Sequence, residues 1–293
     1  MHIYSPEQKV EHPLYKQHRV EVFMKRDDMI HPFISGNKWR KLKYNLQKAQ
    51  QENKKVVVTF GGAWSNHLLA TACAGATFNL KTIGFVRGEE VRNPVLDMCR
   101  LFGMKLLFVS REEYKDKDAL FYQLENKDDN FLINEGGSGL EATWGCKELI
   151  SELKQEYDHI FCAAGTGTTA AGIAIGINDH KWKTLLHVVP VLKNGEFILD
   201  EIKKFNASTD QTILHLDYHF GGYAKTKPDL LAFVQEFVAS TAIMIEPTYT
   251  GKVAYALHDL IKKGYFTENS RILFIHTGGL TGLLGHLDKF KKG

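Results

Sequence analysis

The chain has 293 residues, 44% of them hydrophobic and 24% charged, so it is long enough to bury two hydrophobic cores. Its net charge of +3 is small and its basic residues are spread along the chain, which argues against nucleic-acid and membrane-surface proteins. The start of the chain lacks a signal-peptide pattern, and no stretch approaches the roughly 18 apolar residues of a membrane span. We therefore expect a soluble, cytoplasmic protein. Four widely separated cysteines predict neither a disulfide framework nor a zinc site.

Strand and helix patterns alternate along the chain. Continuous β-branched runs predict buried strands, and apolar residues repeated every three or four positions predict helices. The predicted strands are residues 19–25, 55–60, 81–87, 105–110, 131–134, 160–164, 185–191, 213–218, 242–245 and 271–276. The predicted helices are one that begins within 35–41 and ends near 53, then 65–78, 94–102, 111–126, 141–156, 168–177, 197–205, 229–240, 251–263 and a last one after 276. This alternation predicts an α/β fold with mostly parallel sheets.

Two lysines stand at the start of the first long helix. Lys38 and Lys41 lie three residues apart, on one face of the helix. Two amines near a helix N-terminus repel one another and the positive end of the helix dipole, and a bound anion would remove this conflict. A cofactor with an aldehyde and a phosphate suits the pair, because one lysine can form an imine while the other neutralises the phosphate. On residue type alone, two solvated surface lysines are the alternative.

Four strand ends carry glycine or hydroxyl clusters, and ligands of open α/β sheets bind at the carboxyl ends of strands. In the first cluster, residues 61–67, Ser65 and Asn66 either cap the next helix or bind an anionic oxygen. The second cluster, residues 163–172, is a glycine and threonine turn at a helix N-terminus, which predicts a phosphate site. It lacks the Gly-Lys-Ser/Thr ending of a nucleotide P-loop.

The third and fourth clusters are residues 246–252 and 276–282. Tyr249 offers a proton donor or a stacking ring, and neutral hydroxyls can meet a heteroaromatic nitrogen. Taken singly, each cluster is typical of a capped turn. Together with Lys38, the clusters provide an amine, a phosphate turn and neutral hydroxyls without a metal site. This set indicates pyridoxal 5'-phosphate.

Four motifs in this order resemble the aminocyclopropane-carboxylate deaminase and D-cysteine desulfhydrase family. They are Lys-Arg-Asp-Asp at 25–28, Ser-Gly-Asn-Lys-Trp-Arg-Lys-Leu at 35–42, Gly61-Gly62 followed by Ser65-Asn66-His67, and Pro-Thr-Tyr-Thr-Gly-Lys at 247–252. The resemblance covers most of the chain and implies the pyridoxal-phosphate fold of the tryptophan synthase β-subunit type. It implies two three-layer α/β/α domains, a larger one of residues 1–46 and 137–293 and a smaller inserted one of residues 47–136. The cofactor is then expected in the cleft between them.

The resemblance also implies roles for single residues. Lys38 would form the Schiff base with the cofactor and later move the α-proton of the substrate. Asn66 would bond the phenolic oxygen of the cofactor, and Ser65 would face the substrate carboxylate or act as a nucleophile or proton relay. Tyr249 and Tyr223 match the active-site tyrosines of the family. The residues expected to hold the phosphate are Lys41, Gly165, Thr166, Gly167, Thr168 and Thr169.

The residue after Tyr249 separates the two branches of the family. The deaminase branch has a glutamate there that protonates the pyridine nitrogen, whereas this chain has Thr250, and Thr277 before Gly278, as in the desulfhydrase branch. A hydroxyl partner leaves the ring nitrogen largely neutral, which suits loss of an α-proton and a good β-leaving group better than opening of a cyclopropane. The resemblance therefore predicts α,β-elimination from D-cysteine or a β-substituted D-alanine to pyruvate, ammonia and the leaving group.

Other hypotheses use the same residues. A 1-aminocyclopropane-1-carboxylate deaminase, a β-replacement enzyme or a hydroxy-amino-acid ammonia-lyase would also depend on Lys38. Trp64, where the family usually has glutamine, places an indole that could close the substrate side of the cleft or change its specificity. Alternatives of another class are a non-catalytic pyridoxal-phosphate protein and a nucleotide-binding protein that uses the Gly165 turn. The habit of the family predicts a homodimer that binds a small amino acid and neither nucleic acid nor membrane.

Overall fold

Two β-sheets organise the chain, whose residues 3–290 are described by the computed structural model. The larger sheet contains, in spatial order, β1 (Glu7–Lys9), β2 (Glu21–Lys25), β10 (Arg271–Ile275), β7 (His159–Ala164), β8 (Leu185–Pro190) and β9 (Thr212–Leu214). The smaller sheet contains β5 (Lys105–Val109), β4 (Lys81–Arg87), β3 (Val56–Gly62) and β6 (Asn130–Ile133). In the described residues β1 runs antiparallel to β2, and the other strand pairs are parallel. The predicted α/β fold with mostly parallel sheets is confirmed.

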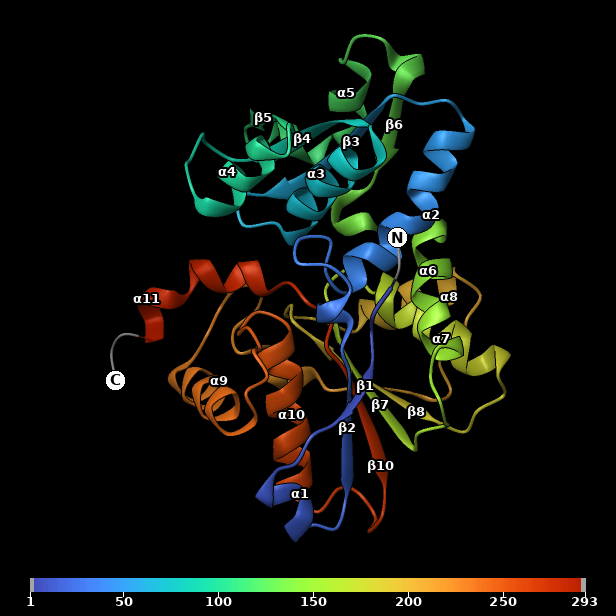
Figure 1. Cartoon of the computed structure of the whole chain (residues 1–293), viewed down its shortest axis with the longest axis vertical. Coiled ribbons are helices and arrows are strands. Elements are labelled where there is room, and N and C mark those ends of the chain that lie inside the picture. Colours follow the sequence, from blue (N-terminus) through green and yellow to red (C-terminus); the bar gives the residue numbers. More distant parts are fainter. Residues whose placement is uncertain (1–2, 291–293) are drawn as a thin grey trace.

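Helices connect these strands and cover both sheets. The α-helices are α1 (Pro13–Gln17), α2 (Asn37–Gln51), α3 (Asn66–Phe78), α4 (Pro94–Leu101), α5 (Lys117–Tyr122), α6 (Leu140–Ser151), α7 (Thr168–Asp179), α8 (Phe197–Lys204), α9 (Pro228–Thr241), α10 (Thr250–Lys262) and α11 (Leu287–Phe290). The 3-10 helices are η1 (Asp27–Met29), η2 (Glu113–Lys115), η3 (Lys127–Asp129), η4 (Glu135–Gly137), η5 (Leu216–His219) and η6 (Leu280–Gly285). Figure 1 shows the smaller sheet with α3, α4 and α5 above the larger sheet.

Three predicted elements differ from the structure. Residues 242–245 form no strand, because both edges of β10 are already paired, with β2 and β7. The helix expected at 111–126 is divided into η2 and α5, because Asp116 has non-helical backbone angles and its side chain accepts from Ala119 N to cap α5. The strand expected at 213–218 ends at Leu214, and the chain turns into η5. The sequence prediction also missed β1 and α1.

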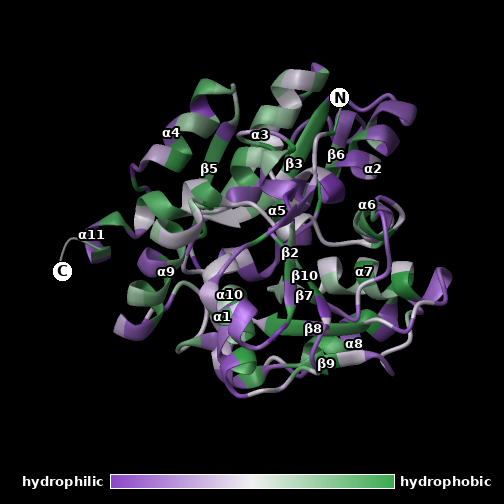
Figure 2. Ribbon diagram, turned by 60° about the horizontal axis from the view of Figure 1, so that its bottom comes forward, coloured by the Kyte–Doolittle hydropathy of each residue, from purple (hydrophilic) through white to green (hydrophobic). Residues whose placement is uncertain are grey.

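Each sheet separates two hydrophobic cores, which gives three layers. In the larger sheet, one face packs against α9 and α10 around Phe274, and the other packs against α6 and α7 around Leu273. In the smaller sheet, Val57 faces α2 and α3, whereas Val58 faces η2 and α5. Adjacent residues of one strand thus enter opposite cores, as the two-residue period of a strand requires. Figure 2 shows the resulting hydrophobic strands, with β3 and β8 as clear examples.

Helix α2 connects the two sheets. It runs from the larger sheet to the smaller one without a break between Asn37 and Gln51 (Figure 1). The four strands of the smaller sheet all lie within the predicted inserted segment, residues 47–136. Because α2 crosses residue 46 as a continuous helix, the exact division of the chain into domains stays a prediction.

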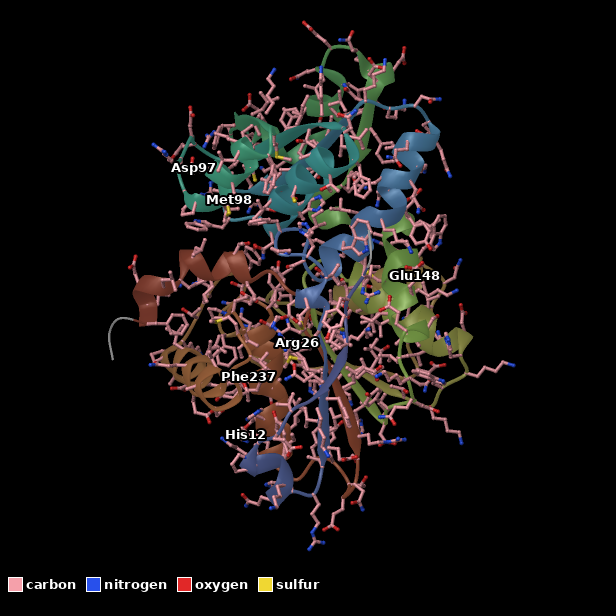
Figure 3. The ribbon with its side chains drawn as sticks, in the orientation of Figure 1. His12, Arg26, Asp97, Met98, Glu148 and Phe237 are labelled. Carbon is pink, nitrogen blue, oxygen red and sulfur yellow. The ribbon has the colours of Figure 1, made fainter. Side chains whose placement is uncertain are left out.

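A buried ion-pair network fixes α2 against the larger sheet. The guanidinium of Arg40, which is 1% exposed, donates to both carboxylate oxygens of Asp27 at 2.6 and 2.7 Å. It also donates to both oxygens of Glu152 at 2.8 Å, and the Lys25 amine lies 3.0 Å from the same Glu152 carboxylate. Nearby, Glu148, which Figure 3 labels on α6, accepts from Lys43 of α2 at 2.7 Å. The sequence motifs at 25–28 and 35–42 therefore contact each other through the ion pair between Asp27 and Arg40.

Replacing Arg40 with methionine would leave the Asp27 carboxylate, which is 0% exposed, without its partner. We expect Arg40→Met to lower the free energy of unfolding by about 3–5 kcal/mol, because an uncompensated charge remains buried. Denaturant unfolding followed by circular dichroism measures this loss. The control is Arg92→Met, since the Arg92 side chain is 87% exposed in its pair with Asp97 and its loss costs less than about 1 kcal/mol. Equal losses in the two variants would contradict the prediction.

Three histidines form a ladder across the larger sheet. His159 Nδ1 lies 3.0 Å from His187 Nε2, and His187 Nδ1 lies 2.8 Å from His215 Nε2. His187 is 0% exposed, and burial, together with its two histidine neighbours, lowers its pKa from 6.5 to about 2. Burial also lowers the pKa of His215 to about 4. The folded protein therefore keeps these rings neutral well below pH 6.5.

The histidine ladder predicts loss of stability in mild acid. Below pH 6.5 the unfolded chain binds a proton at His187 and the folded chain does not, so stability falls with pH down to the folded pKa of about 2. The expected slope is about 1.4 kcal/mol per pH unit for this one residue. In denaturant unfolding at several pH values, His187→Phe should make the slope shallower, whereas His180→Gln, at an exposed position, should not. An unchanged slope in His187→Phe would contradict this account.

Candidate functional site

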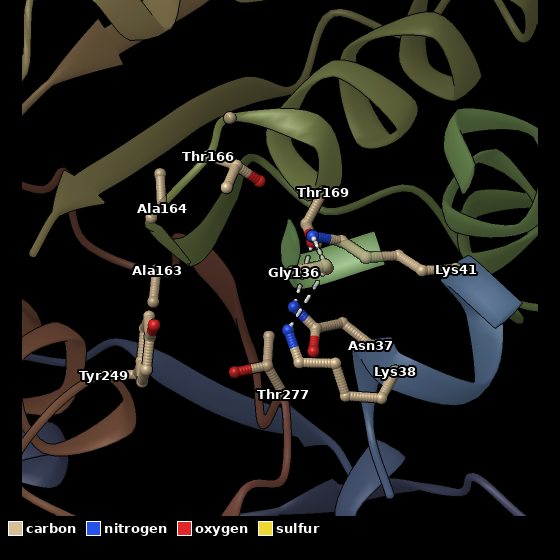
Figure 4. Close-up of a pocket in the computed structure, with 12 residues that line it drawn as sticks. Asn37, Lys38, Lys41, Gly136, Ala163, Ala164, Thr166, Thr169, Tyr249 and Thr277 are labelled. Atoms are coloured by element: carbon tan, nitrogen blue, oxygen red, sulfur yellow. Dashed lines mark hydrogen bonds between the residues drawn. The ribbon is translucent and has the colours of Figure 1, made fainter. Parts of the chain in front are cut away.

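A cavity lies between the N-terminus of α2 and the carboxyl ends of β7 and β10 (Figure 4). It is lined by Asn37, Lys38, Lys41, Gly136, Ala163, Ala164, Gly165, Thr166, Gly167, Thr169, Tyr249 and Thr277. The structure thus brings together residues from three of the four predicted strand-end clusters, with both predicted lysines. Of the other predicted residues, Ser65, Asn66, Thr168, Tyr223 and Thr250 do not line this cavity.

The two lysine amines share one backbone acceptor. Lys38 Nζ and Lys41 Nζ donate to the carbonyl oxygen of Gly136 at 3.5 and 3.2 Å (Figure 4). Burial and the neighbouring Lys41 charge lower the pKa of Lys38 from 10.5 to about 7, and burial lowers the pKa of Lys41. A substantial fraction of Lys38 is therefore an uncharged amine near neutral pH. Such an amine is a nucleophile that attacks an aldehyde.

The start of α2 packs tightly against the segment after β10. Gly36 has φ of +62°, and a Cβ at this position would lie 1.7 Å from the carbonyl oxygen of Thr277. Asn37 N donates to the same oxygen at 3.2 Å. A glycine is required here, because any side chain would separate Thr277 from the helix. This contact places the Thr277 side chain beside Lys38 in the cavity wall.

The turn after β7 provides unpaired backbone donors. Gly167, with φ of +83°, is the N-cap of α7, and within residues 3–290 no side chain caps the first N–H groups of this helix. Asn37 Nδ2 donates to Thr169 Oγ1 at 3.0 Å, and Thr166 Oγ1 lies 3.3 Å from Thr168 Oγ1. Two lysines face the same space, so the cavity wall offers several donors to an anion. These residues fit a phosphate and an aldehyde on one ligand.

The cluster at the start of α3 lies against η6. Ser65 caps α3, since its Oγ accepts from Leu68 N at 3.3 Å. Asn66 Oδ1 accepts from Thr281 Oγ1 at 3.1 Å. Asn66 Nδ2 also lies close to Gly279, where a Cβ would come within 2.7 Å of it. The structure therefore shows the capping role for Ser65 and places Asn66 next to the fourth cluster.

Thr250 faces away from the cavity. It is 0% exposed, and its Oγ1 accepts from Glu246 N at 2.9 Å. Of the two threonines predicted near a ring nitrogen, only Thr277 lines the cavity. None of the residues in the cavity wall carries a carboxylate.

Two tyrosines close another side of the site. The Tyr249 ring lies against Gly165, where a Cβ would be 3.4 Å from the ring. The centroids of the Tyr223 and Tyr249 rings are 6.0 Å apart in an edge-to-face arrangement. Burial raises the pKa of Tyr249 well above 10 and raises the pKa of Tyr223. Both phenols are therefore neutral donors at physiological pH.

Sequence reasoning missed three residues that support the site. The buried Glu246 carboxylate accepts from the N–H groups of Thr248, Tyr249 and Thr250 at 2.7, 2.7 and 2.9 Å, which fixes the Tyr249 backbone. Lys252 Nζ donates to His219 O and Gly222 O, both at 2.8 Å, and so holds the loop before Tyr223. Glu246 had a signal in the preference for acids at helix N-termini. Lys252 was marked only as the last residue of the motif at 247–252 and was given no role, because a lysine inside a helix is usually exposed.

His67 is the third missed residue. Thr59 Oγ1 donates to Ile133 O at 2.7 Å, so it accepts from His67 Nε2 at 2.8 Å. Burial, Lys38 and Lys41 together lower the pKa of His67 well below 6.5. A neutral imidazole thus packs beside the two amines without adding a third charge.

Residues 3–290 contain no group of three His, Cys, Asp or Glu side chains placed to hold a metal ion. In the same range, no helix combines the length and apolar composition needed to span a membrane. The four cysteines are free and buried.

Comparisons with known proteins agree with the geometry. A family model described as pyridoxal-phosphate dependent enzyme matches residues 9–278. A putative 1-aminocyclopropane-1-carboxylate deaminase of Thermotoga maritima is 31% identical, over 92% of each chain. A bifunctional D-cysteine desulfhydrase/1-aminocyclopropane-1-carboxylate deaminase of Arabidopsis thaliana is also 31% identical, over 92% of this chain and 75% of the relative. A D-cysteine desulfhydrase of Klebsiella pneumoniae is 28% identical, over 91% of this chain and 89% of the relative.

Solved structures show the same fold. The crystal structure of an ACC deaminase homologue matches with a TM-score of 0.87 at 28% identity, and covers 98% of this chain and 93% of that one. A fungal L-serine ammonia-lyase from Rhizomucor miehei matches with a TM-score of 0.74 at 16% identity, over 99% and 98% of the two chains, and so shares the fold. The family match, the identity over most of the chain and the fit of the cavity to an aldehyde and a phosphate lead to one conclusion. The chain belongs to the pyridoxal-phosphate-dependent enzymes, in the family of 1-aminocyclopropane-1-carboxylate deaminase and D-cysteine desulfhydrase.

Proposed function

We propose that this enzyme catalyses α,β-elimination on a small amino acid, D-cysteine or a β-substituted D-alanine, to give pyruvate, ammonia and the leaving group. The observation that carries the proposal is the composition of the cavity wall. It contains Lys38 and the neutral hydroxyl of Thr277, and none of its residues carries a carboxylate. A neutral partner for the ring nitrogen suits elimination better than cyclopropane opening. The names of the relatives from Arabidopsis and Klebsiella agree with this substrate.

The residues of the chain divide the work between binding and proton transfer. Bound pyridoxal phosphate supplies the electron sink that acidifies the α-proton. Lys41 and the turn from Gly165 to Thr169 would hold its phosphate, and Asn66 its phenolic oxygen. Thr277 would face the ring nitrogen, whereas the Thr250 hydroxyl is engaged with Glu246. Lys38 Nζ, with a pKa of about 7, is the group that would accept the α-proton.

The neutral phenols and Ser65 complete the assignment. Tyr249 and Tyr223 have raised pKa values, so they would donate to the substrate or the leaving group. Ser65 Oγ accepts from the start of α3, which leaves its hydrogen for the substrate carboxylate. Trp64 packs on Gly285, where a Cβ would lie 3.1 Å from the indole. This contact joins the turn after β3 to η6 and would limit access of water.

Three further proposals concern the whole molecule. We place the domain division at residues 46/47 and 136/137, where the chain passes into and out of the segment that holds the smaller sheet. A homodimer follows the habit of the family, and analytical ultracentrifugation tests it. The third proposal is a cytoplasmic location.

The direct test of the proposed function is an assay with an absorbance spectrum. The reconstituted protein should show a visible cofactor band and release pyruvate and sulfide from D-cysteine. Lys38→Ala should lose the band and the products, because the other amine of the cavity, Lys41, would be engaged with the phosphate. The control is Lys43→Ala, on the same helix but paired with Glu148 outside the cavity.

The products separate the hypotheses. Release of 2-oxobutanoate from 1-aminocyclopropane-1-carboxylate, with no pyruvate from D-cysteine or β-chloro-D-alanine, would favour the deaminase, which the names of several relatives support. A normal band without any product would indicate a non-catalytic pyridoxal-phosphate protein. A band that survives in Lys38→Ala would exclude Lys38 as the bonded amine.

The lowered pKa of Lys38 predicts how the apoprotein reacts with an aldehyde. Pyridoxal, which lacks the phosphate, should react at a rate that rises with pH through about 7, because only the uncharged amine attacks. Lys41→Met removes the neighbouring charge and should move this midpoint upward. Stopped-flow absorbance measures the rates. A midpoint near the usual 10.5, or one that Lys41→Met leaves unchanged, would contradict the assignment.

A further inference from the structure

An arginine at the end of β4 stands over the turn that leads to Ser65. Arg87 is the last residue of β4 and pairs with Gly62, the last residue of β3. A Cβ at Gly62 would have Arg87 Nη2 as its nearest neighbour, at 4.0 Å. Three residues later, Ser65 caps α3. The guanidinium thus lies beside the turn that presents the Ser65 hydroxyl and the N-terminus of α3.

An aromatic face supports this guanidinium. Arg87 Cζ lies 5.5 Å from the centroid of the Tyr114 ring. Tyr114 is 3% exposed and packs in the hydrophobic core that contains Val58 of β3, so its ring is fixed. The charge of Arg87 also affects Tyr223. Burial raises the pKa of Tyr223, and the Arg87 charge partly offsets this increase. Tyr223 in turn contacts Tyr249, a residue of the cavity wall. The charge of Arg87, at the end of β4, therefore acts on a tyrosine that contacts the wall of the candidate active site.

The guanidinium has no acceptor of its own in the described part of the chain, where it forms neither an ion pair nor a side-chain hydrogen bond. The nearby carboxylates are engaged elsewhere. Glu135 pairs with Lys117 at 3.3 Å, and Glu246 accepts from the backbone of α10. A planar guanidinium offers paired N–H donors that match a carboxylate. An exposed arginine of this kind beside an active site attracts an anion.

We propose that Arg87 binds the α-carboxylate of the amino-acid substrate, together with the Ser65 hydroxyl. The proposal rests on the proposed function only in that the site takes an amino acid. Every amino-acid substrate carries this carboxylate, so Arg87 would act on binding whatever the leaving group is. It would orient the α-carbon toward Lys38 from the side of the smaller sheet.

The test compares ligands that differ only in the carboxylate. Isothermal titration calorimetry of the cofactor-loaded protein measures the affinities of D-alanine, L-alanine and the two alaninamides, none of which has a β-leaving group. The unmodified protein should bind at least one alanine more tightly than its amide. Arg87→Gln should weaken binding of that alanine by about tenfold and leave the amide unchanged, because one charge-assisted hydrogen bond is lost. Arg87→Lys should give an intermediate affinity, since the paired donors are lost but the charge remains.

The matched control is Lys117→Gln. Lys117 Nζ lies 4.9 Å from the centroid of the same Tyr114 ring but is paired with Glu135, so its loss should leave alanine binding unchanged. The proposal is overturned if the unmodified protein fails to bind either alanine more tightly than its amide, or if Arg87→Gln weakens alanine and amide equally or neither. The alanines and alaninamides have no β-leaving group, so their binding does not depend on elimination. If the protein fails to turn over D-cysteine, the proposed elimination is contradicted, but the binding data still test the role of Arg87.

Discussion

The buried contact between Arg40 and Asp27 is the constraint on which the site depends. One turn of α2 carries Lys38, Arg40 and Lys41, and successive residues of a helix point about 100° apart. Since Arg40 is fixed to Asp27 and Glu152, the two lysines must face the cavity. Helix α6 strengthens this restraint, because a Cβ at Gly145 would lie 1.9 Å from the Arg40 carbonyl oxygen, so the two backbones touch. The anchor and the reactive amines thus share one helical turn.

The charges in this region are unevenly balanced. The Arg40 network has carboxylates for its own cations, whereas the two amines in the cavity have only the carbonyl of Gly136. Gly136 and Gly137 have φ of +69° and +70°, a conformation that glycine adopts without strain and that presents this carbonyl to both amines. The neighbouring His67 is kept neutral. The two amines therefore leave uncompensated positive charge at the place where an anionic cofactor would bind. This charge favours binding and, together with burial, keeps the pKa of Lys38 low.

The sequence was informative where a function requires particular residue types next to each other. The two lysines at a helix start and the Gly165 to Thr169 turn were found this way, and the structure places most of them around one cavity. It was uninformative where the partner is backbone from a distant segment, as for Lys252, whose acceptors lie 30 and 33 residues away. The strand predicted at 242–245 failed for a related reason. Its alternating pattern is real, with Ile243 and Ile245 buried and Met244 exposed. The nearby strand β10, whose next residue His276 contacts Met244 O, is already paired on both edges.

The protonation states around the cavity limit which group can act as the base. Glu246 is buried and bound by three backbone N–H groups that fix the start of α10, so it serves the backbone and not the substrate. The two phenols have raised pKa values, which makes them donors. His67 is neutral, but its ring is buried and does not line the cavity. Lys38 lines the cavity and has a pKa lowered to about 7, which supports the proposal that it accepts the α-proton.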